Sequence, residues 1–223
     1  ASGQTVTVNY ASSNDSLSFT AADIATNATF VRDVYVGDMD GDGDLDIVSG
    51  SAGDNTVAWY ENNGAANPSF TAANIVTNAD GVRDVYVADM DGDGDLDIVA
   101  AIQDDDLVAW YENNGAANPT WTAANMDPGY NANAATDLYV ADMDGDGDLD
   151  VVLASKWDDE ISWYENDGAA NPSWSASNIA TSANKPVGVY VADMDGDGDL
   201  DIVSASIDDD TIAWYENNGA ANP

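Results

Sequence analysis

The protein is a chain of 223 residues with 42 acidic and 4 basic side chains, which gives a formal charge of −38, and it contains neither histidine nor cysteine. This charge repels phosphates and anionic lipid headgroups, so it argues against nucleic-acid binding and membrane insertion. The missing residue types exclude disulfides, thiolate nucleophiles, imidazole bases and zinc sites built from nitrogen and sulfur ligands. Cations held by oxygen atoms remain the natural ligands.

Four internal repeats follow an N-terminal leader. The string DMDGDGDLD begins at Asp38, Asp89, Asp142 and Asp193, and the string WYEN follows each of them, at Trp59, Trp110, Trp163 and Trp214. We divide the chain into a leader strand region (1–17) and repeats 18–68, 69–119, 120–172 and 173–223. A period of about 50 residues is typical of propellers and related repeat arrays.

Each repeat has the pattern of short β-strands, and helix signals are absent. In the second repeat, apolar and β-branched runs predict strands at 70–75, 85–89, 97–102 and 107–112, separated by turns rich in Gly, Asn and Asp. Four short antiparallel strands in about 50 residues is the size of one propeller blade. We therefore predict an all-β array of four tandem four-stranded antiparallel blades, and leave open whether it closes a ring, stays open or forms filaments.

Aromatic residues recur at the same places in the repeats. They are Tyr35, Tyr86, Tyr139 and Tyr190; the four WYEN tryptophans; and Phe19, Phe70, Trp121 and Trp174. One interpretation is packing between neighbouring blades, since each blade can bury its faces only against its neighbours. The other is a set of exposed rings that stack on sugars.

The acidic loops have the spacing of a calcium loop. In the first, carboxylates stand at positions 1, 3, 5, 7 and 9, and glycine at position 6 supplies a sharp bend. We expect positions 1, 3, 5 and 9 to coordinate through side chains, and position 7 through its main-chain carbonyl while its carboxylate faces water. An EF-hand is excluded because its flanking helices and its Glu at position 12 are both missing. Without a cation, mutual repulsion of the carboxylates would be costly.

This D-x-D-x-D-G-x-x-D loop between two strands, followed by WYEN, resembles the FG-GAP or VCBS repeat family over residues 18–223. The resemblance implies four-stranded blades, usually seven to a ring, with one Ca²⁺ in each loop and four in this chain. The ligand positions that it implies are Asp38, Asp40, Asp42, Asp44 and Asp46; Asp89, Asp91, Asp93, Asp95 and Asp97; Asp142, Asp144, Asp146, Asp148 and Asp150; and Asp193, Asp195, Asp197, Asp199 and Asp201.

Three further features carry weaker signals. Acidic clusters at 104–106, 158–160 and 208–210 are expected to be solvated turns or secondary cation sites. The repeated glutamates Glu61, Glu112, Glu165 and Glu216 could in principle hydrolyse glycosides, but catalytic groups are normally not repeated. Asn14 and Asn27 fit the N-glycosylation pattern.

From these observations we expect a non-enzymatic, calcium-stabilised protein of the extracellular space or cell surface, acting as a structural or adhesive module. The alternatives are a carbohydrate-binding propeller and a non-catalytic appendage of a larger secreted protein. Glycans or extracellular proteins are the expected partners, together with self-association. The final WYEN strand at 214–217 has no following partner in the sequence. At the other end, the leader carries a strand-like segment at 6–10, and the first strand at 18–24 has no WYEN strand before it. They could pair within one chain or join successive chains head to tail into a filament.

Overall fold

The computed structural model describes residues 5–9, 16–126 and 132–220, and within them the regular structure is β-strand alone. The strands are β1 (Thr5–Asn9), β2 (Ser16–Thr20), β3 (Val31–Gly37), β4 (Asp46–Ser51), β5 (Thr56–Asn62), β6 (Phe70–Val76), β7 (Val82–Ala88), β8 (Asp97–Ile102), β9 (Leu107–Asn113), β10 (Trp121–Asn125), β11 (Ala135–Ala141), β12 (Asp150–Ser155), β13 (Glu160–Asn166), β14 (Trp174–Ala180), β15 (Pro186–Ala192), β16 (Asp201–Ser206) and β17 (Thr211–Tyr215). The all-β prediction is confirmed. Across the described residues, no helix is long and apolar enough to span a membrane.

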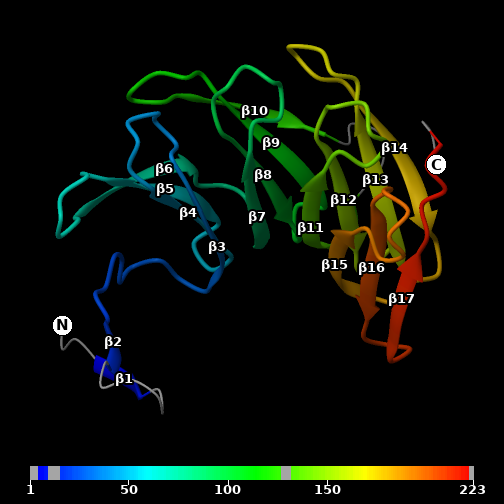
Figure 1. Ribbon diagram of the computed structural model, residues 1–223, viewed down its shortest axis with the longest axis horizontal. Helices are drawn as coiled ribbons and strands as arrows, with labels where there is room; N and C mark the ends of the chain where they lie inside the picture. Colours follow the sequence, from blue (N-terminus) through cyan, green and yellow to red (C-terminus); the bar gives the residue numbers. More distant parts are fainter. Residues whose placement is uncertain (1–4, 10–15, 127–131, 221–223) are drawn as a thin grey trace.

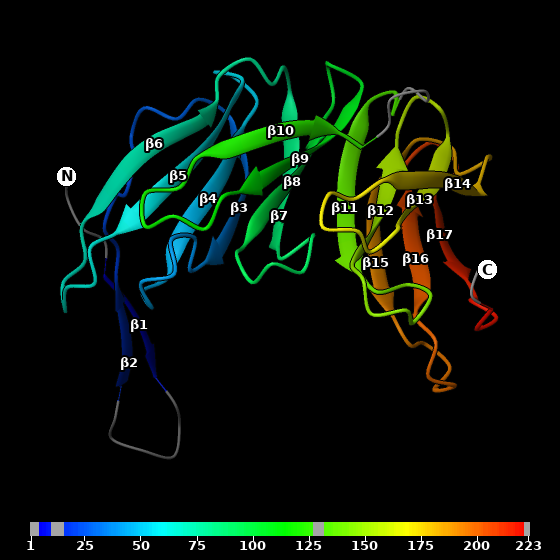
Figure 2. The ribbon, with the colours of Figure 1, turned by 90° about the horizontal axis from the view of Figure 1, so that it is seen from above.

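Four antiparallel sheets stand next to one another in an open arc (Figures 1 and 2). We call them blades 1 to 4: β3–β6, β7–β10, β11–β14 and β15–β17. Strands β3, β7, β11 and β15 contact one another in sequence, so they form the inner side of the array. The β1–β2 hairpin stands apart from the blades, at the end of the arc opposite blade 4.

The sheets are offset from the sequence repeats. The first strand of each later repeat pairs with the last strand of the repeat before it, so β6, β10 and β14 complete blades 1, 2 and 3. In the part of the chain that the structure describes, blade 4 therefore has three strands where the others have four. The predicted strands agree with the observed ones except that β7 begins three residues earlier, at Val82, which is fully buried, and ends before Asp89.

The apolar core lies between neighbouring blades. The tryptophans of the WYEN strands in blades 1 to 3 are buried there, with exposed fractions of 1–3%. On the inner side, the rings of Tyr35, Tyr86, Tyr139 and Tyr190 form a column with centroid separations of 4.7, 5.8 and 4.9 Å. The structure thus favours the packing interpretation of the repeated aromatics, since these buried tryptophans present no ring to a sugar.

The two end blades each leave one face uncovered. Val34 and Val36 of blade 1 are 57% and 51% exposed, whereas their counterparts in blade 2 are almost fully buried. At the other end, Ile212 is 81% exposed and Trp214 is 50% exposed. These exposed faces show that the arc does not close on itself into a four-bladed ring.

The segment that precedes blade 1 has only part of the strand that its sequence predicts. We expected a strand over 18–24, but β2 ends at Thr20 and pairs with β1. The corresponding strands β6 and β14 run through seven residues because a WYEN strand pairs with them along that length. The segment at 21–25 is without such a partner, and its side chains are exposed.

Candidate metal centres

Each acidic loop joins the inner strand of a blade to the second strand. In the first, Asp38 follows β3 and Asp46 opens β4. Gly41 and Gly43 take φ values of 72° and 94°, which bend the chain tightly enough to turn alternate side chains toward one centre. The same pair of left-handed glycines recurs in the other three loops.

Three carboxylates converge in every loop. Each contributes one oxygen, and these oxygens lie within 4.8 Å of one another in the sets Asp38, Asp40 and Asp42; Asp89, Asp91 and Asp97; Asp142, Asp144 and Asp146; and Asp193, Asp195 and Asp197. Oxygens bound to Ca²⁺ at about 2.3–2.6 Å are separated by at most about 5 Å, so the sets fit a single cation of this size. Positions 1, 3 and 5 meet in three loops, and positions 1, 3 and 9 meet in the second.

Backbone N–H groups shape these carboxylates into a ring. Asp38 accepts hydrogen bonds from Asp42 N (3.1 Å) and Gly43 N (2.9 Å), and Asp42 accepts one from Asp44 N (2.9 Å). The second loop repeats the pattern, with Asp89 accepting from Asp93 N and Gly94 N. The loop geometry is therefore set by its own amides, and the remaining lone pairs of the carboxylates can face a cation.

The position-9 aspartates are buried and have a structural role. Asp46 accepts N–H bonds from Met39 (3.1 Å) and Asn62 (2.7 Å), which ties the start of the acidic loop to the end of β5. The equivalent bonds form around Asp97, Asp150 and Asp201. The position-9 aspartate thus holds the two ends of the acidic loop together, and it also adds a carboxylate to the loop.

The position-7 carboxylates are only partly exposed, whereas we expected them to face water. They lie against the glycine of the turn after the WYEN strand: an ideal Cβ at Gly64 would be 1.9 Å from Asp44 Oδ2, and at Gly115 1.8 Å from Asp95 Oδ2. Asp148 and Asp199 lie in the same way against Gly168 and Gly219. Only glycine leaves room for this contact.

The asparagine that ends WYEN links neighbouring loops, a role that the sequence analysis missed. Asn113 Nδ2 donates to Leu96 O of its own loop (3.0 Å) and to Met39 O of the preceding loop (2.8 Å). Asn166 and Asn217 repeat both bonds, to Leu149 and Met90 and to Leu200 and Met143. A constant separation of 16 residues between Asp position 9 and this asparagine was the available signal.

The environment of the loops changes along the arc. Desolvation raises the pKa of Asp97 to about 7 and that of Asp150 to about 6, although N–H donors oppose the shift. Desolvation also acts on Asp201, but the amides of Asn217 and Met194 outweigh it and its pKa is lowered. Met194 is 55% exposed, whereas Met39, Met90 and Met143 are buried. The last loop is thus not covered by a neighbouring blade.

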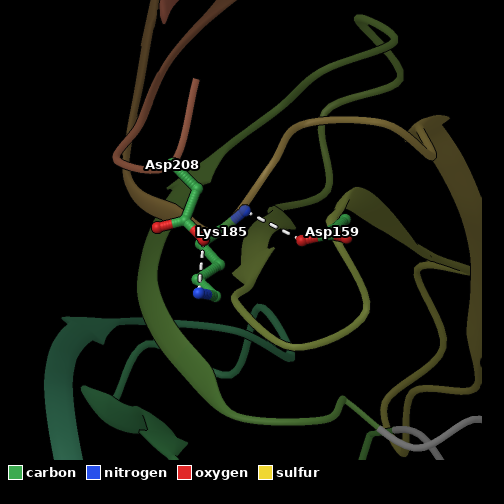
Figure 3. A network of polar contacts seen from close by, with 3 residues as sticks. All are labelled: Asp159, Lys185 and Asp208. Carbon is green, nitrogen blue, oxygen red and sulfur yellow. Dashed lines mark hydrogen bonds and ion pairs between the residues drawn. The ribbon is translucent and has the colours of Figure 1, made fainter. Parts of the chain in front are cut away.

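The other acidic clusters serve as joints between blades. Asp106 Oδ1 accepts from Ala134 N and Asp159 Oδ1 accepts from Lys185 N, both at 2.9 Å and both across a blade boundary. Lys185 also forms an ion pair with Asp208 (Figure 3). These contacts favour the interpretation as turns over that as secondary cation sites. Asn27 is exposed, and Asn14 lies outside the described residues.

Comparison with known proteins gives a family and a fold. The model of the FG-GAP-like repeat matches three times, over residues 38–100, 91–153 and 142–204. No curated protein matches. Among solved structures, an Agrocybe aegerita lectin that recognises non-reducing terminal N-acetylglucosamine is similar, with a TM-score of 0.50, 23% identity and coverage of 83% of this chain and 52% of the lectin. The V. cholerae biofilm matrix protein Bap1 is similar with a TM-score of 0.52, 24% identity and coverage of 84% of this chain and 27% of Bap1.

Proposed function

The chain belongs to the FG-GAP-like repeat family, and from this membership and its four acidic loops we propose that it is a calcium-stabilised extracellular module with a structural or adhesive role. The observation that carries the proposal is the convergence of three carboxylates at the same place in every repeat. The twenty loop aspartates named from the sequence supply the side chains and carbonyls around these centres.

Calcium is the proposed ion because the loops are flexible and rich in oxygen ligands. Mg²⁺ requires near-octahedral geometry and retains several waters, whereas Ca²⁺ accepts six to eight oxygens in varied arrangements. Extracellular calcium modules bind at about 10⁻⁴–10⁻³ M, so at about 1 mM Ca²⁺ each loop adds roughly 0.4–1.4 kcal/mol to the free energy of unfolding. Four loops together add about 2–6 kcal/mol, which is comparable to the whole stability of a domain.

Thermal melting with and without chelator tests this proposal. Excess EDTA is expected to lower the melting temperature strongly, because it removes the bound cations and exposes the mutual repulsion of the loop carboxylates. Ca²⁺ should restore the original melting temperature more fully than Mg²⁺ does. A melting curve that EDTA leaves unchanged would remove calcium from the proposal.

We assign no catalytic activity to the chain in this proposal. Each WYEN glutamate and each aspartate of the acidic loops has counterparts in the other three repeats, and the composition offers no histidine or cysteine. A structural or adhesive role does not require a residue that is unique to one repeat. The similarity to Bap1, a biofilm matrix protein, is compatible with an extracellular role but extends to the fold alone.

Carbohydrate binding is the second candidate. The similarity to a lectin and one exposed ring favour it: Trp157, in the turn between β12 and β13, is 61% exposed. Binding on a glycan array that is lost in Trp157→Ala would support this role. The chain spans about half of the lectin and about a quarter of Bap1, so a role as one part of a larger secreted protein also fits.

Self-association is the last part of the proposal. The uncovered face of blade 4 and the uncovered face of blade 1 correspond to the two sides of every internal blade boundary, so copies of the chain can join head to tail. Such a contact closes into a ring if successive rotations bring the ends together and otherwise extends without limit; the filament is the form that we propose.

A further inference from the structure

We infer that residues 19–25 of one copy form the fourth strand of blade 4 in a second copy, with Phe19 seated in a cavity between blades 3 and 4. This inference rests on the head-to-tail association proposed above and names the contact that would produce it. The segment that fills the cavity and the vacant strand position comes from a second copy of this chain.

The cavity has a volume of about 340 Å³ and lies where the other blades hold an aromatic ring. It is lined by Met143, Trp163, Ile202, Tyr215, Glu216 and Asn217, among others. At the two other blade boundaries, Trp121 of β10 and Trp174 of β14 pack against the equivalent apolar cluster. Within the described residues, no fourth strand of blade 4 brings such a ring, so the slot between Trp163 and Tyr215 is open.

The register of the complete blades fixes where the missing strand would lie. In blades 1 to 3 the leading aromatic residue of the fourth strand is paired with the WYEN asparagine: Phe70 with Asn62, Trp121 with Asn113 and Trp174 with Asn166. In blade 4 this asparagine is Asn217, which lines the cavity. A strand that pairs with β17 in the same register therefore places its aromatic residue in the cavity.

The donor segment has the sequence of the missing strand. Residues 19–25 read Phe-Thr-Ala-Ala-Asp-Ile-Ala, and β6 begins Phe-Thr-Ala-Ala-Asn-Ile. Phe19 is 56% exposed and Ile24 is 44% exposed, whereas their counterparts Phe70 and Ile75 are partly buried in blade 1. The donor thus carries two apolar side chains without cover, and β17 carries an unpaired edge.

The remaining blade surfaces fit the same arrangement. When blade 1 of the second copy follows blade 4 of the first, its Val34 and Val36 join Ile212 and Trp214 in one apolar cluster, as Val85 and Val87 share a buried cluster with Val57 and Trp59 inside the chain. Asn62 then stands toward Met194 as Asn113 stands toward Met39, whose carbonyl it binds at 2.8 Å. The contact between two copies can therefore reproduce both the apolar packing and the asparagine hydrogen bond of an internal blade boundary.

A second copy is favoured over the same chain because of where the donor lies. The β1–β2 hairpin and blade 4 are at opposite ends of the open arc (Figures 1 and 2). Residues 19–25 directly precede blade 1, just as β6 directly precedes blade 2. The donor of one copy can therefore complete the sheet of another while its own blade 1 stacks behind that sheet.

Single-cysteine variants of the full chain test the register. Thr20 would pair with Glu216, since Thr71 pairs with Glu61 and Thr122 with Glu112. Thr20→Cys and Glu216→Cys, mixed at high concentration in Ca²⁺ and oxidised, are expected to form a disulfide dimer, because paired residues of antiparallel strands have suitable Cα separations. Thr20→Cys mixed with Thr211→Cys, at the far end of β17, is the matched control and should not crosslink.

Phe19→Ala provides the energetic test by sedimentation. It should weaken assembly at least tenfold, because full burial of an aromatic side chain is lost, while Trp157→Ala, which removes another exposed ring, leaves assembly unchanged. Filaments that form without the Thr20–Glu216 crosslink would overturn the strand donation and leave head-to-tail association intact. A chain that stays monomeric would overturn both, whereas the calcium-dependent melting is measured independently of either.

Discussion

The side-chain amide of Asn113 links the acidic loops of blades 1 and 2. Its Nδ2 donates to Met39 O in the loop of blade 1 and to Leu96 O in the loop of blade 2. Asn113→Ala should destabilise the protein by about 2–4 kcal/mol, since the buried carbonyl of Met39 and the partly buried carbonyl of Leu96 lose their donor. Asn62→Ala is the matched control, because within the described residues the side-chain amide of Asn62 donates to Leu45 O of its own blade and to no carbonyl of another blade. Chemical denaturation in Ca²⁺ would measure both; equal losses would contradict a role for the bond between blades.

Gly115 is needed for two separate reasons, its φ of 64° and the carboxylate of Asp95 beside it. Gly115→Ala should therefore cost more than the roughly 1 kcal/mol of a left-handed alanine. Gly92→Ala measures the backbone cost alone, since Gly92 has φ of 74° and no atom near an added Cβ. If the two variants melt at the same temperature, the contact with Asp95 has no energetic weight.

The sequence predicted that alternate aspartates of each loop converge, but the structure brings position 9 into the converging set in the second loop alone, and the partners of other residues were not predicted. The spacing of alternate aspartates and glycine predicted the converging carboxylates, because local chain curvature decides that geometry. The partners of Asp95 and Asn113 come from other strands or another blade. Such contacts depend on how the sheets pack, which periodicity within one loop does not describe.

The acidic loop is the element on which the calcium proposal depends. Asp89→Ala should remove one bound Ca²⁺ in a calorimetric titration and leave the other three, because repeats of this kind couple mainly to their neighbours. Asp105→Ala removes the same charge from a turn outside the loops and should leave the count unchanged. Loss of all binding in Asp89→Ala would show that the loops act as one cooperative unit.

The strands were predictable from apolar patterning, and their pairing was predictable in part. The handover from a WYEN strand to the next Ser-Phe-Thr-Ala-Ala segment indicated that these two segments pair, and β5–β6 does so. The short β2 shows the limit of patterning. Phe-Thr-Ala-Ala occurs in both segments, but β6 runs through it to Val76 beside β5, whereas β2, which pairs with β1, ends at Thr20, because the partner strand determines how far the ladder extends.

The inner strands of blades 1 to 3 carry a line of acidic groups, Asp33, Asp84 and Asp137, that should make stability depend on pH. Asp84 accepts a hydrogen bond from Leu138 N, and desolvation, together with the nearby charges of Asp137 and Asp33, raises its pKa to about 8. Because the folded pKa exceeds the unfolded value, the folded state holds the proton more tightly. This contribution is complete below about pH 4 and is lost as the pH rises through about 8.

Asp84→Asn should remove this dependence, since the amide stays neutral and can still accept from Leu138. At pH 8 and fixed Ca²⁺ the variant is expected to be more stable than the unaltered protein by about 1–3 kcal/mol, and the difference should shrink toward pH 5. Denaturation at several pH values would measure it, with Asp105→Asn as the exposed control. A difference that grows toward low pH would contradict the raised pKa.

The overall arrangement was less accessible from the sequence than its parts. Repeat count and blade size follow from the period of about 51 residues, but an open arc and a closed ring share the same local pattern. The structure distinguishes them through exposure: Val34 and Ile212, which have buried counterparts inside the chain, are uncovered at the two ends. The curvature of the array is the sum of the rotations at all blade boundaries, so the sequence pattern of one repeat does not predict it.

The offset between sheets and repeats has a consequence for how such genes can change length. Because the last strand of each complete blade belongs to the next repeat, every internal junction is made from the same two pieces of sequence. Unequal recombination between two repeats would insert or delete one whole blade and recreate an identical junction at the crossover point. Neighbouring blades would keep their registers, so the number of blades can vary without any new contact having to evolve.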